Sequence, residues 1–121
     1  MKEYIPVNAP QIGNTKTTHL KIEIYYNLGG YNYFTYRQEK RGFYISVSPV
    51  ERREYAPGLM MEGTTCFSGY KALLKEVTRK SAKAEREAEA AAPALREELI
   101  RRVMAENRLT FADAAPEART A

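Results

Sequence analysis

The sequence predicts an α+β fold: a three- to four-stranded antiparallel meander packed on one face by a long helix, then a second C-terminal helix. Two observations carry this prediction. Residues 19–50 alternate apolar and polar side chains with period two, which is typical of half-buried strands. Residues 70–109 instead repeat apolar side chains at helical spacing and are rich in strong helix formers.

Composition limits the classes of protein that fit this chain. The 121 residues suffice for one domain, and 44% apolar residues allow a modest core. No apolar run approaches the roughly 20 residues of a membrane-spanning helix, and no secretory signal is visible, so we expect a cytoplasmic protein with no membrane contact. The net charge of +4 is a weak indication of polyanionic partners such as nucleic acids.

The strands are expected in order after an extended, flexible N-terminal arm over residues 1–18, where prolines and a glycine interrupt any hydrophobic period. Ile5 and Val7 of this arm could dock on the core. A glycine pair and a polar turn separate the first three strands, which favours antiparallel neighbours. A fourth strand follows a charged loop that ends in Pro57-Gly58. The predicted strands cover residues 19–27, 31–38, 43–50 and 59–67.

Alternation assigns the side chains of these strands to two faces. The apolar face should pack against the long helix, and the opposite face should stay in contact with water, as is common in antiparallel sheets. The core is expected to contain Leu20, Ile22, Ile24, Phe34, Phe43, Ile45, Val47, Leu73, Leu74 and Val77.

The long helix should begin after the N-cap residue Ser68 and complete an α+β domain over residues 19–92. Pro93 cannot donate a hydrogen bond inside a helix, so it should kink the helix or begin a new one. We expect a C-terminal helix over residues 93–111. Its apolar side chains need a partner, which leads us to expect a homodimer. Residues 112–121 should form a disordered tail.

The water-facing side of the sheet is the main candidate for a functional site. Tyrosine rings there can stack on unpaired bases, while lysine and arginine side chains hold phosphates. The same pattern also fits a protein-binding surface, or tyrosine pairs that only stabilise the sheet. The expected nucleic-acid-binding residues are Lys21, Tyr25, Tyr33, Arg37, Lys40, Arg41, Tyr44, Arg52 and Arg53.

A second basic set, predicted along the long helix, either follows a phosphate backbone or is an ordinary solvated helix face. It consists of Lys71, Lys75, Arg79, Lys80 and Lys83.

The sequence contains no complete catalytic motif. His19 is the only histidine and Cys66 the only cysteine, which are too few for a zinc site. A lone histidine also lacks the orienting carboxylate that a general base needs. We therefore expect no enzymatic activity, no metal and no cofactor.

The order of a meander followed by a long helix resembles, over about residues 21–84, the PC4-like single-strand-binding proteins. That resemblance implies dimerisation through the helix and nucleic-acid binding on a curved sheet. The run YNLGGYNYFTYRQEKRGFYISVSP, residues 26–49, also looks like small proteins of bacterial plasmids, phages and conjugative elements. This second resemblance implies a bacterial cytoplasmic setting.

We therefore expect a non-enzymatic protein that binds nucleic acid, single-stranded and with low sequence specificity, through the tyrosine-rich basic face. The alternative is a protein-interaction module, such as an accessory or host-defence-inhibiting protein of a mobile element. DNA and RNA both remain open as ligands.

Overall fold

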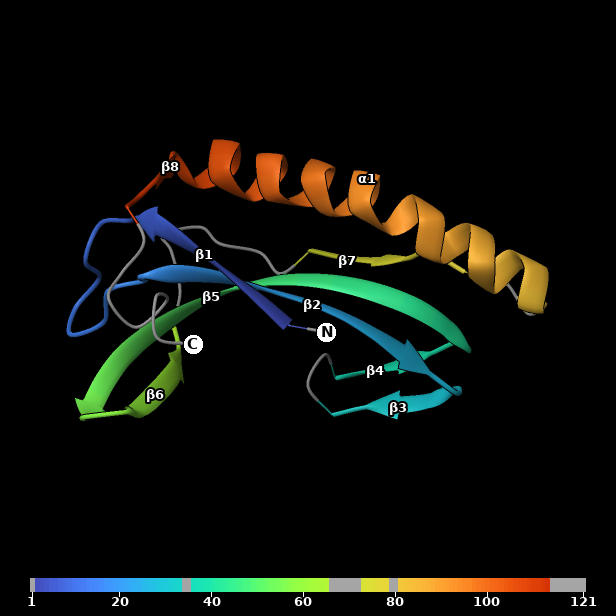
Figure 1. Ribbon diagram of the computed structural model, residues 1–121, viewed down its shortest axis with the longest axis horizontal. Helices are drawn as coiled ribbons and strands as arrows, with labels where there is room; N and C mark the ends of the chain where they lie inside the picture. Colours follow the sequence, from blue (N-terminus) through green and yellow to red (C-terminus); the bar gives the residue numbers. More distant parts are fainter. Residues whose placement is uncertain (1, 34–35, 66–72, 79–80, 114–121) are drawn as a thin grey trace.

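The computed structural model describes residues 2–33, 36–65, 73–78 and 81–113. In these residues the chain forms an α+β fold, with one long helix lying along one face of a curved antiparallel sheet (Figure 1). The elements are β1 (Lys2–Asn8), β2 (His19–Asn27), β3 (Gly30–Asn32), β4 (Arg37–Glu39), β5 (Gly42–Ala56), β6 (Leu59–Thr64), β7 (Leu73–Glu76), α1 (Ala82–Asn107) and β8 (Thr110–Phe111).

The main sheet has six strands in the order β6-β5-β2-β1-β8, with β7 also paired to β5. Strand β5 is long enough to pair with β7 near its start and with β6 near its end. A strand does occur at Leu59–Thr64, within the fourth strand that the sequence predicts. The predicted strand count is nevertheless too low, because β1, β7 and β8 also join the sheet.

Strands β2 and β5 confirm the apolar, helix-facing side that alternation predicts. Their antiparallel register places Ile22 beside Val47 and Ile24 beside Ile45, on the side of the helix. Ile22, Ile45 and Val47 are buried there. Lys21, Glu23 and Tyr25 alternate with these residues along β2 and therefore point to the opposite face.

The predicted meander is wrong between these two strands. β2 pairs directly with β5, and residues 30–39 form a separate two-stranded hairpin of β3 and β4. A straight strand over 31–38 would need extended backbone throughout, but Tyr36 has a φ of 56° in the left-handed region. The hairpin lies on the side of the sheet opposite α1 (Figure 1).

Helix α1 supplies much of the core. Ser81 caps its start, since the Ser81 hydroxyl accepts a hydrogen bond from the Ala84 N–H at 3.1 Å. Its apolar side packs on the helix-facing side of the sheet. The buried core cluster consists of Val7, Leu20, Ile22, Ile45, Val47, Ala92, Leu99, Ile100, Val103, Met104 and Leu109.

Some residues that the sequence predicts in the core lie outside the buried cluster. Phe43 is only partly buried and contacts the edge of the Tyr26 ring. Ile24 and Val77 pack at the margin of the core cluster. Phe34 and the side chains of residues 73 and 74 lie outside the described part of the chain.

The prediction of two helices that meet at Pro93 is wrong. The described residues hold one continuous helix, and Leu73–Glu76 is a strand. Pro93 lies inside α1, where the loss of one backbone donor is offset by burial of the helix on the sheet. Because Leu99 and Val103 are buried against the chain's own sheet, the reason for expecting a homodimer is lost. The homodimer itself stays a prediction.

Part of the N-terminal arm predicted over residues 1–18 is a strand of the sheet, β1. Lys2–Asn8 lies between β2 and β8, and Ile5 and Val7 reach the core. Pro6 accepts a backbone hydrogen bond from the Ala112 N–H at 3.1 Å, which ties the two ends of the described chain together. Of the tail predicted over residues 112–121, residues 114–121 lie outside the described residues. No helix of the described chain is both long and apolar enough to cross a membrane.

Candidate nucleic-acid interface

Of the three tyrosines expected on the water-facing side of the sheet, Tyr25 and Tyr44 lie together there, but they are covered. Tyr25 and Tyr44 lie on neighbouring strands with parallel rings, 5.6 Å between centroids and 15° between planes. Tyr44 is only 4% exposed, and its hydroxyl donates a hydrogen bond to the Lys40 carbonyl at 2.8 Å. Burial raises the pKa of both phenols. The chain's own hairpin occupies that face, which argues against the stacking role predicted for these two tyrosines.

Glu39 is the residue that holds the hairpin on the sheet. Its buried carboxylate accepts hydrogen bonds from Asn27 Nδ2 at 2.8 Å, Asn32 Nδ2 at 3.0 Å and Tyr25 Oη at 3.1 Å. Burial opposes the charge, but the hydrogen bonds outweigh it, so the pKa of Glu39 lies below its ordinary value. The hairpin is thus fixed to β2 by a satisfied buried anion.

Lys21 and Arg52 both contact neighbouring side chains of the sheet. The Lys21 ammonium lies 2.9 Å from Glu62 and 3.2 Å from Glu23, so its charge is neutralised. The Arg52 guanidinium sits 3.8 Å from the centre of the Tyr4 ring, in a cation–π contact. Both residues bind neighbours within the protein, which argues against the phosphate-binding role predicted for them.

Arg53 and Arg41 also have acidic partners. Arg53 Nη2 lies 2.6 Å from Glu51 Oε1. Arg41 Nε donates a hydrogen bond to the Tyr26 hydroxyl at 2.7 Å, and its guanidinium lies 3.8 Å from Glu85 at the start of α1. Arg41 therefore faces the helix side of the molecule, away from the other basic residues of the hairpin.

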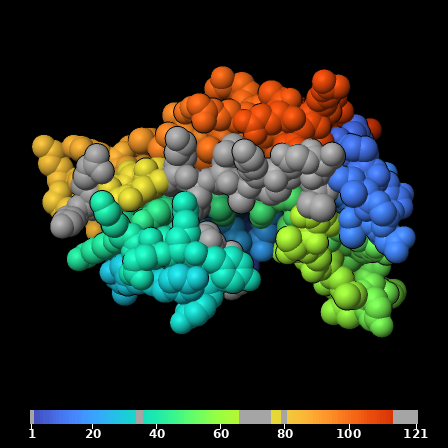
Figure 2. Space-filling model, turned by 180° about the vertical axis from the view of Figure 1, so that it is seen from behind, coloured from blue at the N-terminus to red at the C-terminus, as the bar shows by residue number. Residues whose placement is uncertain are grey.

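The β3–β4 hairpin presents a cluster of exposed rings. Tyr31, Tyr33 and Tyr36 are 48%, 78% and 79% exposed. Tyr31 and Tyr33 contact each other edge to face, with 5.0 Å between ring centroids. Figure 2 shows this hairpin, in cyan to teal, projecting from one end of the molecule, while the β5–β6 end projects from the other.

Two of the predicted basic residues accompany these rings. Arg37 is about half exposed, and its guanidinium reaches the buried Glu39 carboxylate only at 3.9 Å. Lys40 is exposed, and among the described residues it forms no ion pair. We name Tyr31, Tyr33, Tyr36, Arg37 and Lys40 the hairpin cluster. It brings together Tyr33, Arg37 and Lys40 from the predicted site and leaves the other predicted residues outside.

Sequence reasoning missed Tyr31 and Tyr36. In an extended strand Tyr36 would share the face of Phe34, which is expected in the core, but the left-handed backbone of Tyr36 breaks that alternation. The signal that could have found them is the density of aromatic side chains directly after Gly29-Gly30, since paired glycines favour a tight reversal.

The structure gives His19 a structural setting. Its ring is fully buried, and Nδ1 lies 2.7 Å from the Thr18 hydroxyl. Cys66 lies outside the described residues. Within the described ranges, no group of three or more His, Cys, Asp or Glu side chains could hold a metal ion.

No known protein family, curated protein or solved structure matches this chain. The likeness to PC4-like proteins and to small proteins of mobile elements therefore stays an expectation, and the case for function depends on the residues themselves.

Proposed function

We propose that this protein binds single-stranded nucleic acid through the hairpin cluster, without catalysis and with low sequence specificity. The observation that supports this most is the exposure of Tyr31, Tyr33 and Tyr36 on one small hairpin. A soluble surface rarely leaves neighbouring large rings in water without a partner. Base stacking on aromatic rings is the use that such rings commonly have in proteins that bind unpaired strands.

Charge on the hairpin supports the same ligand. Arg37 and Lys40 are exposed beside the rings, whereas the one carboxylate of β4, Glu39, is buried and engaged in hydrogen bonds. The accessible charge of the cluster is therefore positive. Phosphates of a bound strand would be attracted to it, and the attraction should weaken as salt rises.

The hairpin is also held in place for binding. Glu39 fixes it to β2, and the covered pair of Tyr25 and Tyr44 forms its base. A ligand then meets rings on an ordered support, which lowers the entropy lost on binding. Stacking accepts any base, so little sequence preference is expected.

A fluorescence anisotropy titration with labelled single-stranded oligonucleotides tests the proposal. Tyr33→Ala removes the ring and should weaken binding by roughly 5- to 150-fold, the range given by stacking energies of about 1–3 kcal/mol. If Arg37 and Lys40 each neutralise one phosphate, raising salt from about 50 to 200 mM should weaken binding by roughly sevenfold.

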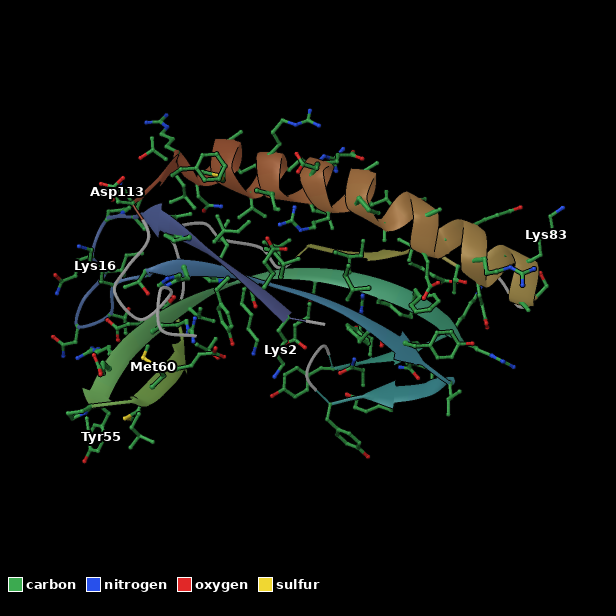
Figure 3. The ribbon with its side chains drawn as sticks, viewed as in Figure 1. Lys2, Lys16, Tyr55, Met60, Lys83 and Asp113 are labelled. Carbon is green, nitrogen blue, oxygen red and sulfur yellow. The ribbon has the colours of Figure 1, made fainter. Side chains whose placement is uncertain are left out.

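Tyr55→Ala is the matched control. Tyr55 is 71% exposed, but it lies near the tip of the β5–β6 hairpin, at the other end of the sheet (Figure 3). This change should leave the affinity within about twofold of the unaltered protein, since an exposed side chain off the site contributes little. Absence of binding at low salt, or equal losses for Tyr33→Ala and Tyr55→Ala, would contradict the proposal.

A protein-interaction module is the second candidate, and the β5–β6 hairpin favours it. There Tyr55, Leu59 and Met61 are all more than half exposed, and β6 ends the path of paired strands in the described sheet. An exposed strand edge can accept a strand from a partner. A partner captured on the immobilised protein after nuclease treatment, and lost with Met61→Glu, would support this function over the first.

A further inference from the structure

We infer that the Tyr36 ring stacks on an unpaired base of the ligand. The left-handed backbone that carries this exposed ring lowers the stability of the free protein. This inference rests on the proposed function and deepens it, because it predicts that the Tyr36 ring adds affinity for the strand and lowers the stability of the free protein.

The first step is the backbone of Tyr36. Its φ of 56° lies in the left-handed region, which L-residues with bulky side chains avoid. Glycine or asparagine adopts this conformation more easily. A tyrosine at this position therefore lowers stability relative to those residues.

The second step is that the Tyr36 side chain makes no contact that offsets this loss of stability. The Tyr36 ring is 79% exposed, and within the described chain it makes no hydrogen bond, ion pair or ring contact. Burial or pairing of the phenol therefore does not compensate the strain. Strained residues of this kind concentrate at binding and catalytic sites.

Arg108 provides an internal comparison. It is the other described non-glycine residue with a positive φ, at 52°. Its conformation has a reason in the fold, since it caps α1 and its N–H bonds to the Ala105 carbonyl at 3.3 Å. The left-handed φ of Tyr36 belongs to the turn between Asn32 and Arg37. Glycine or asparagine would close that turn with less strain, so the turn does not explain why a tyrosine with an exposed ring stands there.

The third step is position. Tyr36 directly precedes Arg37 and belongs to the same hairpin as the Tyr31–Tyr33 ring pair. Rings beside a guanidinium fit a strand that offers base faces and phosphates together. A duplex hides its base faces in the stack, so an unpaired strand complements this surface better.

The experiment combines thermal unfolding with anisotropy titrations of single-stranded and duplex oligonucleotides on the full chain. Tyr36→Gly should raise Tm by about 3–6 °C by relieving the left-handed strain. The same variant should weaken single-strand binding by roughly 5- to 150-fold. Tyr36→Asn tolerates the same backbone but lacks the ring, so it should weaken binding similarly, whereas Tyr36→Phe should bind like the unaltered protein.

Tyr55→Gly is the matched control with the opposite sign. Tyr55 is a similarly exposed tyrosine with negative φ, at the register shift near the end of β5. Glycine there relieves no left-handed strain and adds backbone entropy to the unfolded state. It should lower Tm and leave binding unchanged. A residue with a purely structural role would not show a gain in Tm together with a loss of affinity.

The outcomes separate this inference from the proposed function. If the protein binds single strands and Tyr33→Ala weakens binding, but Tyr36→Asn does not, the inference is wrong and the proposed function stands. A fall in Tm for Tyr36→Gly, or tighter binding to duplex than to single strand, also overturns the inference. If the unaltered protein binds no oligonucleotide, the proposed function itself fails.

Discussion

Replacing Glu39 with alanine should destabilise the protein by about 3–5 kcal/mol. The carboxylate accepts hydrogen bonds from Asn27, Asn32 and Tyr25 in a site that is almost closed to water. Hydrogen bonds to a charged group contribute about 1.5–3 kcal/mol each, but their losses are not additive because freed donors regain water when the hairpin opens. Glu39→Gln keeps the shape and one oxygen, so it should cost about 1–2 kcal/mol.

Urea unfolding followed by circular dichroism measures these differences. Glu98→Ala is the control, since Glu98 forms an exposed helical pair with Arg102 at 3.5 Å that is worth about 0.3–0.5 kcal/mol. A loss below about 1 kcal/mol for Glu39→Ala would refute the reasoning, because a buried charge acceptor cannot be removed so cheaply.

Acid titration tests the same site by a different route. The pKa of Glu39 is lower in the folded protein than in the unfolded chain, so its contribution is complete above the unfolded value of about 4.3 and is lost as pH falls through the folded value. Stability should therefore decline below about pH 4. Glu39→Gln should flatten this decline, although Glu62, whose pKa is also lowered, will retain part of it.

Two further predictions concern helix α1. Leu99→Ala should lower the free energy of unfolding in urea by about 2–5 kcal/mol because Leu99 is 1% exposed. Leu28→Ala, at 79% exposure, should lower it by less than about 0.5 kcal/mol. Equal losses for the two variants would show that Leu99 does not belong to the core. Pro93→Ala should raise the unfolding free energy by about 1–3 kcal/mol because it restores a helical backbone donor, and a loss of stability would show that α1 needs the proline to follow the sheet.

The faces of β2 and β5 could be predicted from sequence because their side chains alternate without interruption. The buried positions of Leu20, Ile22, Ile45 and Val47 follow from that period alone. Alternation is a local property, so it survives even when the strand pairing is predicted wrongly.

The elements that failed depend on contacts between distant segments. Residues 73–77 fit a helical apolar period as well as a strand, and pairing of Leu73–Glu76 with the edge of β5 decides for the strand. Lys2–Asn8 carries no strong period of its own, yet it lies between β2 and β8. Local propensity cannot report such pairings.

The candidate site shows the same limit. The sequence predicts Tyr25, Tyr33 and Tyr44 near one another on adjacent strands, but only Tyr25 and Tyr44 lie side by side, because β2 pairs directly with β5. The hairpin that covers this pair is held by Glu39 through side-chain hydrogen bonds. Glu39 reads in the sequence only as part of a charged turn. Its burial, and the resulting exposure of Tyr31 and Tyr36, appear only in three dimensions.

A two-dimensional proton–nitrogen NMR titration with an oligothymidylate tests the central claim most directly, because it locates the binding surface on the whole chain without any substitution. We expect the largest shift changes at Tyr31, Tyr33, Tyr36 and Arg37, with little change at Tyr55 and along β6. Changes centred on the β5–β6 hairpin, or no changes at low salt, would contradict the assignment of the hairpin cluster as the nucleic-acid interface.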